Sequence, residues 1–156
     1  MLAYDPDTGS LTWKVTRGRC VAGKEAGALN VRFGCRQLGL GGGFVYAHQV
    51  AWLLSYGYWP ETDIDHINGD RADNRLSNLR ECTHAQNAKN MKMHRDNSSG
   101  FKGAYYNRTQ RQWISQIMVD GRIHYLGTFR SAEECAAAYD AASRRLHGEF
   151  ARPNGA

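Results

Sequence analysis

The sequence predicts an α+β fold made of small antiparallel sheets and short helices, and two stretches carry this prediction. In the first, a short apolar strand, a turn-rich loop and a second strand precede a helix that begins after Thr83. In the second, the strand patterns 112–119 and 122–129 flank Asp120-Gly121, a strong signal for a tight hairpin, and a helical pattern follows.

Composition limits the size of the core and suggests a kind of partner. The chain has 156 residues, of which 42% are hydrophobic, which allows one domain or two small ones. Residues 1–90 contain 10 Lys and Arg against 9 Asp and Glu, whereas residues 91–156 contain 10 against 6. A basic C-terminal part favours a polyanion partner there, the alternative being an ordinary solvated surface.

The four cysteines are widely spaced and form no CxxC pair, so no structural zinc is expected. Such cysteine usage is typical of a reducing compartment. The sequence has no signal-peptide pattern and no apolar run near 18 residues. We therefore expect a cytoplasmic protein that does not associate with a membrane.

Residues 1–45 are expected to form a β-rich lead-in. A strand, a tight turn and a second strand are predicted over residues 4–14, and further short strands around 31–33 and 36–38. The glycine run 41–43 lacks the Lys-Ser/Thr and the strand-to-helix frame of a nucleotide-binding loop, so that function is rejected.

A helix is predicted from Ala47 to Tyr56, because Val50 and Leu54 recur at helical spacing. It is expected to support the hairpin that follows. His48 lies on this helix, either as a structural hydrogen-bonding residue or as support for a site.

The run from Ile64 to Asp70 contains adjacent Asp65 and His66 at the end of a strand. Thr83 and Gln86 form a capping-box pattern for a helix expected to continue to Met93. Packing of that helix across the hairpin would bring its Asn87 beside Asp65, with His66 facing the same cavity. Carboxylate and amide oxygens suit a hydrated magnesium ion, and a neutral histidine can take a proton from water. Ordinary surface and turn chemistry is the alternative.

The whole array resembles the HNH homing and phage endonucleases, the ββα-metal nucleases, in the variant with Asn as the third motif residue. The resemblance covers residues 46–92 through the segments YAHQVAWLL, DIDHINGDRADN, SNLREC and THAQNAKN. It implies Asp65 and Asn87 as ligands of a divalent metal, magnesium or alternatively manganese, and His66 as general base. Further roles follow by position: structural support from Asn78, His48 and Asn90, and phosphate contacts from Arg80 and Lys89.

Residues 95–100 are polar and lack apolar periodicity, so they are expected to be a linker. A three-stranded sheet is predicted beyond it, over 101–106, 112–119 and 122–129. Ser131 and Glu134 then open a helix that ends near Gly148. Its alanine-rich stripe predicts close packing on one face of the sheet.

This C-terminal part resembles the plant Apetala-two (ethylene-response-factor) DNA-binding domain through SGFKGAYY, RQWISQI, YLGTF, SAEECAAAYDAA and LHGEFARPN. The resemblance implies that the open face of the sheet contacts the major groove of double-stranded DNA. Core packing is the alternative for two of the candidates, Trp113 and Tyr125, and the plant domains have more arginines in the first strand. The candidates are Lys102, Tyr105, Arg108, Arg111, Trp113, Arg122 and Tyr125.

Together these features predict an HNH endonuclease domain at 1–94, with lead-in 1–45 and ββα-metal core 46–93, a linker at 95–100 and a DNA-binding domain at 101–156. The expected function is metal-dependent nicking of DNA by a phage homing-type enzyme in the cytoplasm of a bacterial host. The alternative is a non-catalytic DNA-binding regulator derived from such a nuclease. RNA as substrate is disfavoured by the resemblance alone. The target sequence stays open, as does the choice between monomer and homodimer.

Overall fold

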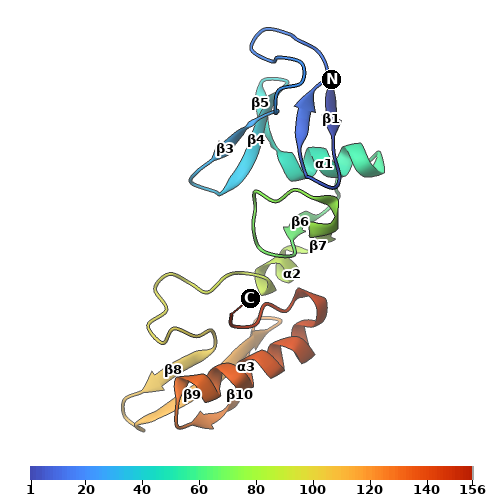
Figure 1. The fold of residues 1–156 in the computed structure, drawn as a ribbon. Coiled ribbons are helices and arrows are strands. Elements are labelled where there is room, and N and C mark those ends of the chain that lie inside the picture. Colours follow the sequence, from blue (N-terminus) through green and yellow to red (C-terminus); the bar gives the residue numbers. More distant parts are fainter. Residues whose placement is uncertain (156) are drawn as a thin grey trace. The chain divides into compact units, whose positions relative to one another are not determined.

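The computed structural model describes residues 1–155 and confirms the α+β fold (Figure 1). The chain forms two compact units, the first from Met1 to His84 and the second beginning at Ala85. Each unit combines small antiparallel sheets or hairpins with short helices. Within residues 1–155, no helix has both the length and the apolar character needed to cross a bilayer.

The first unit begins with a hairpin of β1 (Leu2–Tyr4) and β2 (Leu11–Trp13), as predicted. A meander of β3 (Ala28–Asn30), β4 (Cys35–Leu40) and β5 (Gly43–Tyr46) follows. Both are short, because glycines with positive φ interrupt the strands.

The strand predicted around residues 31–33 is wrong, because these residues form the turn between β3 and β4. The Asn30 side chain causes the turn: its Oδ1 accepts hydrogen bonds from the backbone N–H groups of Arg32 at 3.1 Å and Phe33 at 3.3 Å. Val31 is consequently 87% exposed despite its preference for strands.

Helix α1 (Ala47–Tyr56) confirms the predicted helix and joins two parts of the first unit. It ends at Gly57, whose φ of 80° allows its N–H to bond with Leu53 O. Val50 packs with Leu11 and Leu38 of the lead-in. On the same helix, Ala51 and Trp52 pack with Ile64 and Leu79 of the following hairpin. The helix therefore supports that hairpin, as expected.

The hairpin consists of β6 (Asp63–His66) and β7 (Leu79–Cys82), paired antiparallel, with a long loop that ends in the 3-10 turn η1 (Leu76–Asn78). Helix α2 (His84–Lys89) follows and is shorter than the predicted extension to Met93. It ends here because Asn90 N–H donates to Asn87 O at 3.1 Å. This bond spans three residues, as in a 3-10 turn, instead of the four of an α-helix.

The second unit contains a sheet in the order β10-β9-β8, formed by β8 (Ala104–Asn107), β9 (Gln112–Val119) and β10 (Arg122–Phe129). Helix α3 (Ala132–His147) covers one face of it and leads into the 3-10 turn η2 (Gly148–Phe150) (Figure 1). Strands β9 and β10 and helix α3 confirm the predicted ranges. Ser131 caps α3 by accepting the N–H of Glu134 at 3.2 Å.

The segment expected as a linker, residues 95–100, contains neither helix nor strand. The two compact units divide earlier, between His84 and Ala85. Residues of α2 explain this earlier division: Ala85, Ala88 and Lys89 line a hollow together with Met118 and Tyr139 of the second unit.

Gly103 decides where β8 begins and is expected to be indispensable for the second unit. It has a φ of +72°, and a Cβ atom here would lie 2.0 Å from Tyr139 Cδ2 and 2.7 Å from Gln116 O. We expect Gly103→Ala to lower the free energy of unfolding by about 2–4 kcal/mol, measured by urea denaturation.

The matched control is Gly100→Ala, since Gly100 has a φ of +76° but no atom within 4 Å of its Cβ position. This variant should lower the free energy of unfolding by only about 1–2 kcal/mol, the cost of placing a residue with a Cβ atom at positive φ. Equal losses in both variants would contradict the packing argument.

Candidate functional site

The hairpin β6–β7 places Asp65 and His66 at the end of a strand and buries both, at 4% and 5% exposure. Asp65 pairs across the hairpin with Arg80. Arg80 Nε and Nη2 donate to Asp65 Oδ2 at 2.9 and 2.7 Å. A buried carboxylate requires such compensation, because its charge has little access to water.

His66 is oriented by a buried amide. Its Nε2 lies 3.2 Å from Asn74 Oδ1, and because an amide oxygen only accepts, Nε2 carries the proton in this contact. The basic lone pair of the neutral ring then lies on Nδ1. Burial lowers the pKa of His66 from its ordinary value, against the opposing effect of the Asn74 hydrogen bond. His66 is therefore neutral near pH 7, the state that a general base requires.

His48 forms one wall of this site. Its ring lies edge-on to that of His66, with centroids 5.1 Å apart, and stacks on Tyr46 at 5.3 Å. Burial lowers the pKa of His48 to about 3, with the nearby His66 and Arg71 acting in the same direction. The Nδ1 atom of His48 is buried and makes no hydrogen bond. His48 thus acts as a neutral packing partner of His66.

This depressed pKa predicts an acid-dependent loss of stability. The unfolded chain takes up a proton on His48 near pH 6.5, whereas the folded chain does so only near pH 3. Stability is therefore complete above pH 6.5 and falls as the pH drops towards 3, by at most about 1.4 kcal/mol per pH unit. We expect His48→Gln to flatten this slope in urea unfolding measured from pH 7 to 4. An unchanged slope would contradict the assignment.

The loop between the two strands is tied by Asn78. Its Nδ2 donates to Asp73 O at 2.8 Å, and its Oδ1 accepts the N–H of Asn68 at 2.9 Å. Its backbone O accepts the N–H of Ile67, also at 2.9 Å. These bonds fix the loop that presents Asn74 to His66.

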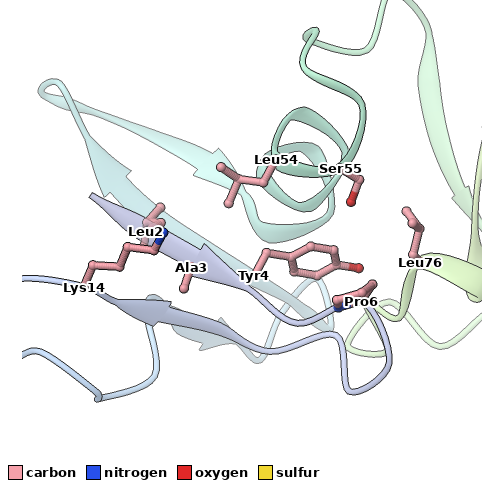
Figure 2. Close-up of a pocket in the computed structure, with 8 residues that line it drawn as sticks. All are labelled: Leu2, Ala3, Tyr4, Pro6, Lys14, Leu54, Ser55 and Leu76. Atoms are coloured by element: carbon pink, nitrogen blue, oxygen red, sulfur yellow. The ribbon is translucent and has the colours of Figure 1, made fainter.

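Asn74 is the residue that sequence reasoning missed, since no functional role was assigned to it from the sequence. It is buried, and besides contacting His66 it accepts the Tyr4 hydroxyl on its backbone O at 2.7 Å. Figure 2 shows the Tyr4 ring in a hollow below Leu54 and Ser55 of α1, with Pro6 and Leu76 near its hydroxyl end. Burial is the main cause that raises the pKa of Tyr4 to about 12, so its hydroxyl stays a donor. Nothing in the sequence distinguishes Asn74 from the other asparagines of this loop, Asn68 and Asn78.

The third motif residue, Asn87, lies half-buried on α2 in the second unit. In the same turn, Asn90 is buried. Lys89 lies with its Nζ 3.8 Å from Asp120 Oδ1, also within the second unit. The first unit thus brings together His48, Asp65, His66, Asn78 and Arg80, and the second carries Asn87, Lys89 and Asn90.

The sheet of the second unit has one face covered by α3, as the bond from Ser115 Oγ to Cys135 O at 3.0 Å demonstrates. Trp113 is two residues before Ser115 and so shares this covered face, where its ring lies 5.3 Å from that of Tyr106. This placement favours the packing alternative for Trp113.

Tyr105 and Tyr125 lie on the open face, since they pair with Ile114 and Gln116, which alternate with Ser115. They are 41% and 63% exposed. The hydroxyl of Tyr125 bonds to that of Thr128, which steadies the ring.

The basic candidates are distributed around the sheet. Arg108 and Arg111 are exposed in the turn between β8 and β9, and Arg122 is exposed at the start of β10. Lys102 is half-buried, its Nζ donates to Arg152 O at 2.8 Å, and burial lowers its pKa. Its ammonium group is thus engaged within the unit, whereas the three arginines face solvent.

The donor atoms of the site limit which metal ion it could hold. Among residues 1–155, no three His, Cys, Asp or Glu side chains converge as metal ligands. One carboxylate with one amide oxygen nevertheless suits magnesium, which retains several waters and takes ligands from substrate phosphate. The Asp65 carboxylate has the right chemistry, but Arg80 already offsets its charge. The residues therefore fit a weakly held ion.

One protein family and several known proteins are similar to parts of this chain. A family model described as HNH endonuclease matches residues 45–89. Protein 3.8 of Escherichia phage T7 is 36% identical over 108 residues, which cover 67% of this chain and 87% of that protein. The uncharacterized HNH endonuclease L560 of Acanthamoeba polyphaga mimivirus is 31% identical over 91 residues, which cover 58% of this chain and 46% of that protein.

A further relative comes from plants. The ethylene-responsive transcription factor ERF084 of Arabidopsis thaliana is 48% identical over 59 residues, which are 36% of this chain and 23% of that protein. This similarity is consistent with an Apetala-two-type domain in the C-terminal part. No solved structure shows a significant match to the chain.

Proposed function

Because the chain contains an HNH endonuclease domain at residues 45–89 and is related to protein 3.8 of phage T7, we propose that it is a metal-dependent DNA endonuclease that hydrolyses a phosphodiester bond. One observation supports the proposal above all others. His66 is neutral, buried and held through Nε2 by Asn74, and it follows the buried Asp65, whose charge acts on it, in strand β6. That is the arrangement of an oriented base next to an oxygen ligand.

In this proposal the Asp65 carboxylate and the Asn87 amide oxygen would be the protein ligands of a divalent cation, magnesium or manganese. The cation, when bound, stabilises negative charge on the phosphate and on the leaving oxygen. His66 takes a proton from the attacking water on Nδ1, because Nε2 is committed to Asn74. Asn74 keeps the ring from turning, and His48 excludes water from its edge.

Arg80 and Lys89 would contact the phosphate, and Asn78 and Asn90 would hold the surrounding loop and helix turn. The products would carry a 5′-phosphate and a 3′-hydroxyl. Since one chain offers one base, a monomer would nick double-stranded DNA, and cutting both strands would require a dimer or two events. The phage relative supports a place of action in the cytoplasm of an infected bacterial host.

The second unit would target the nuclease. The exposed faces of Tyr105 and Tyr125 offer surfaces for base or sugar contacts, and Arg108, Arg111 and Arg122 offer charge for the backbone. Lys102 and Trp113 remain candidates by resemblance. The similarity to the Arabidopsis transcription factor supports DNA as the partner. We propose a homing-type role on this basis.

A non-catalytic DNA-binding protein is the second candidate, and one observation favours it. The ion pair between Asp65 and Arg80 already satisfies the carboxylate that a metal would need. A chain that has lost activity could keep such a pair as part of its fold.

Supercoiled plasmid distinguishes the two candidates. The full chain is incubated with plasmid and magnesium, with and without excess chelator, and the products are separated on an agarose gel. Nicked circles that disappear with chelator are expected. A shifted but uncut plasmid at the same protein concentrations would support the binder instead.

A further inference from the structure

This inference rests on the proposed function and concerns Arg80. The hairpin register sets Arg80 directly opposite Asp65. Two guanidinium nitrogens donate to the same carboxylate oxygen, Oδ2, at 2.9 and 2.7 Å, and the side chains are only 14% and 5% exposed. The positive charge that neutralises Asp65 in this structure is therefore a side chain of the protein itself.

We propose that Arg80 guards metal loading: in the DNA-free chain it occupies Asp65 and keeps the affinity for divalent cations low until a DNA phosphate takes over its guanidinium. The exchange is chemically balanced. A guanidinium pairs with phosphate as well as with carboxylate, and a phosphodiester carries the same single negative charge as Asp65. Arg80 therefore stays paired throughout, and Asp65 becomes available to the cation without any buried charge being left alone.

Electrostatic repulsion explains why Arg80 would keep the affinity for divalent cations low. A divalent cation that approached Asp65 with Arg80 in place would meet a like charge within a few ångströms, in a site that solvent screens poorly. Removal of Arg80 takes the guanidinium charge away from a buried carboxylate, which then favours a cation more strongly. Metal and DNA should consequently bind together, and the free chain should carry little metal.

The test measures Mn²⁺ binding to the full chain without DNA, from the electron paramagnetic resonance signal of free Mn²⁺. Arg80→Gln removes the charge, and it should bind Mn²⁺ at least about tenfold tighter than the wild type. Arg80→Lys keeps the charge, and its affinity should stay within about threefold of the wild type. The double variant Asp65→Asn/Arg80→Gln should lose the gain. An Arg80→Gln chain that binds no tighter than the wild type overturns the proposal.

A thermal melt provides a second readout, because Arg80→Gln also breaks a buried pair. Its melting temperature should lie below that of the wild type without metal and recover as Mn²⁺ is added, whereas the wild type should respond little. If this variant is unfolded without metal, refolding on addition of Mn²⁺ is the expected result. Failure to recover at millimolar Mn²⁺ would mean that Arg80 is only structural.

Neither readout depends on cleavage, so the guard and the nuclease can fail separately. If the wild-type chain nicks plasmid and Arg80→Gln gains no Mn²⁺ affinity, the proposed nuclease function stands and the proposed role of Arg80 is wrong. If Arg80→Gln binds Mn²⁺ tightly and the wild-type chain never cuts DNA, the proposed role of Arg80 in metal binding stands and the proposed nuclease function is wrong.

Discussion

Replacement of His66 by Ala is expected to reduce plasmid nicking by about 10²- to 10⁴-fold, the range that a positioned general base contributes. The ring is buried, neutral and fixed by Asn74, so its loss removes the proposed base while Asp65 keeps its ion pair with Arg80. The rate is measured with supercoiled plasmid at saturating magnesium.

DNA binding should survive this replacement, because the residues proposed to bind DNA are carried largely by the second unit. A gel shift with uncut plasmid should give an affinity within about threefold of the wild type. His94→Ala is the matched control, since the His94 side chain is 78% exposed and its Nδ1 lies 3.4 Å from Oδ2 of Asp96, which is 88% exposed. Nicking that persists in His66→Ala, or binding that is lost with it, would remove His66 from the proposed role.

Because His66 is buried, its replacement also creates a cavity, and loss of folding must be separated from loss of chemistry. A urea unfolding curve of each variant makes this separation. If His66→Ala remains folded at the assay temperature and does not cut, the loss belongs to the missing imidazole.

Local pattern was sufficient for much of this fold. Helix α1 and strands β9 and β10 follow from side-chain periodicity and from the Asp120-Gly121 turn, all of which are properties of neighbouring residues. Errors arose where a local hydrogen bond overrode the preference of the neighbouring residues. The Asn30 side chain placed residues 31–33 in a turn, and the backbone bond from Asn90 N–H to Asn87 O ended α2 early.

The residue types of the proposed site could be taken from the sequence, whereas their contacts could not. The types and order of Asp65, His66 and Asn87 carry a recognisable motif. The partners of these residues come from elsewhere in the chain: Arg80 from the opposite strand, and Asn74 from a loop that Tyr4 holds from β1. Such long-range contacts depend on packing and register, which a single sequence does not encode in any local pattern.

Gly9 tests how far this remote support matters. It lies in the turn between β1 and β2 with a φ of +75°, and a Cβ atom there would lie 2.5 Å from Arg75 N and 2.6 Å from Asn74 C. Both are backbone atoms, so the loop that carries Asn74 would have to move. The same loop is attached to this turn by the bond from Leu76 N–H to Pro6 O at 3.0 Å.

We expect Gly9→Ala to lower the free energy of unfolding of the first unit by about 2–4 kcal/mol and to slow nicking in the fraction that stays folded. Gly18→Ala is the matched control, because Gly18 also has a positive φ, +59°, but nothing within 4 Å of its Cβ position. It should lose about 1–2 kcal/mol and nick normally. Since both variants pay the same backbone strain, the excess loss in Gly9→Ala measures the contact with the Asn74 loop. If nicking by folded Gly9→Ala equals that of Gly18→Ala, the position of Asn74 does not control His66, and the histidine must be oriented by its other neighbours.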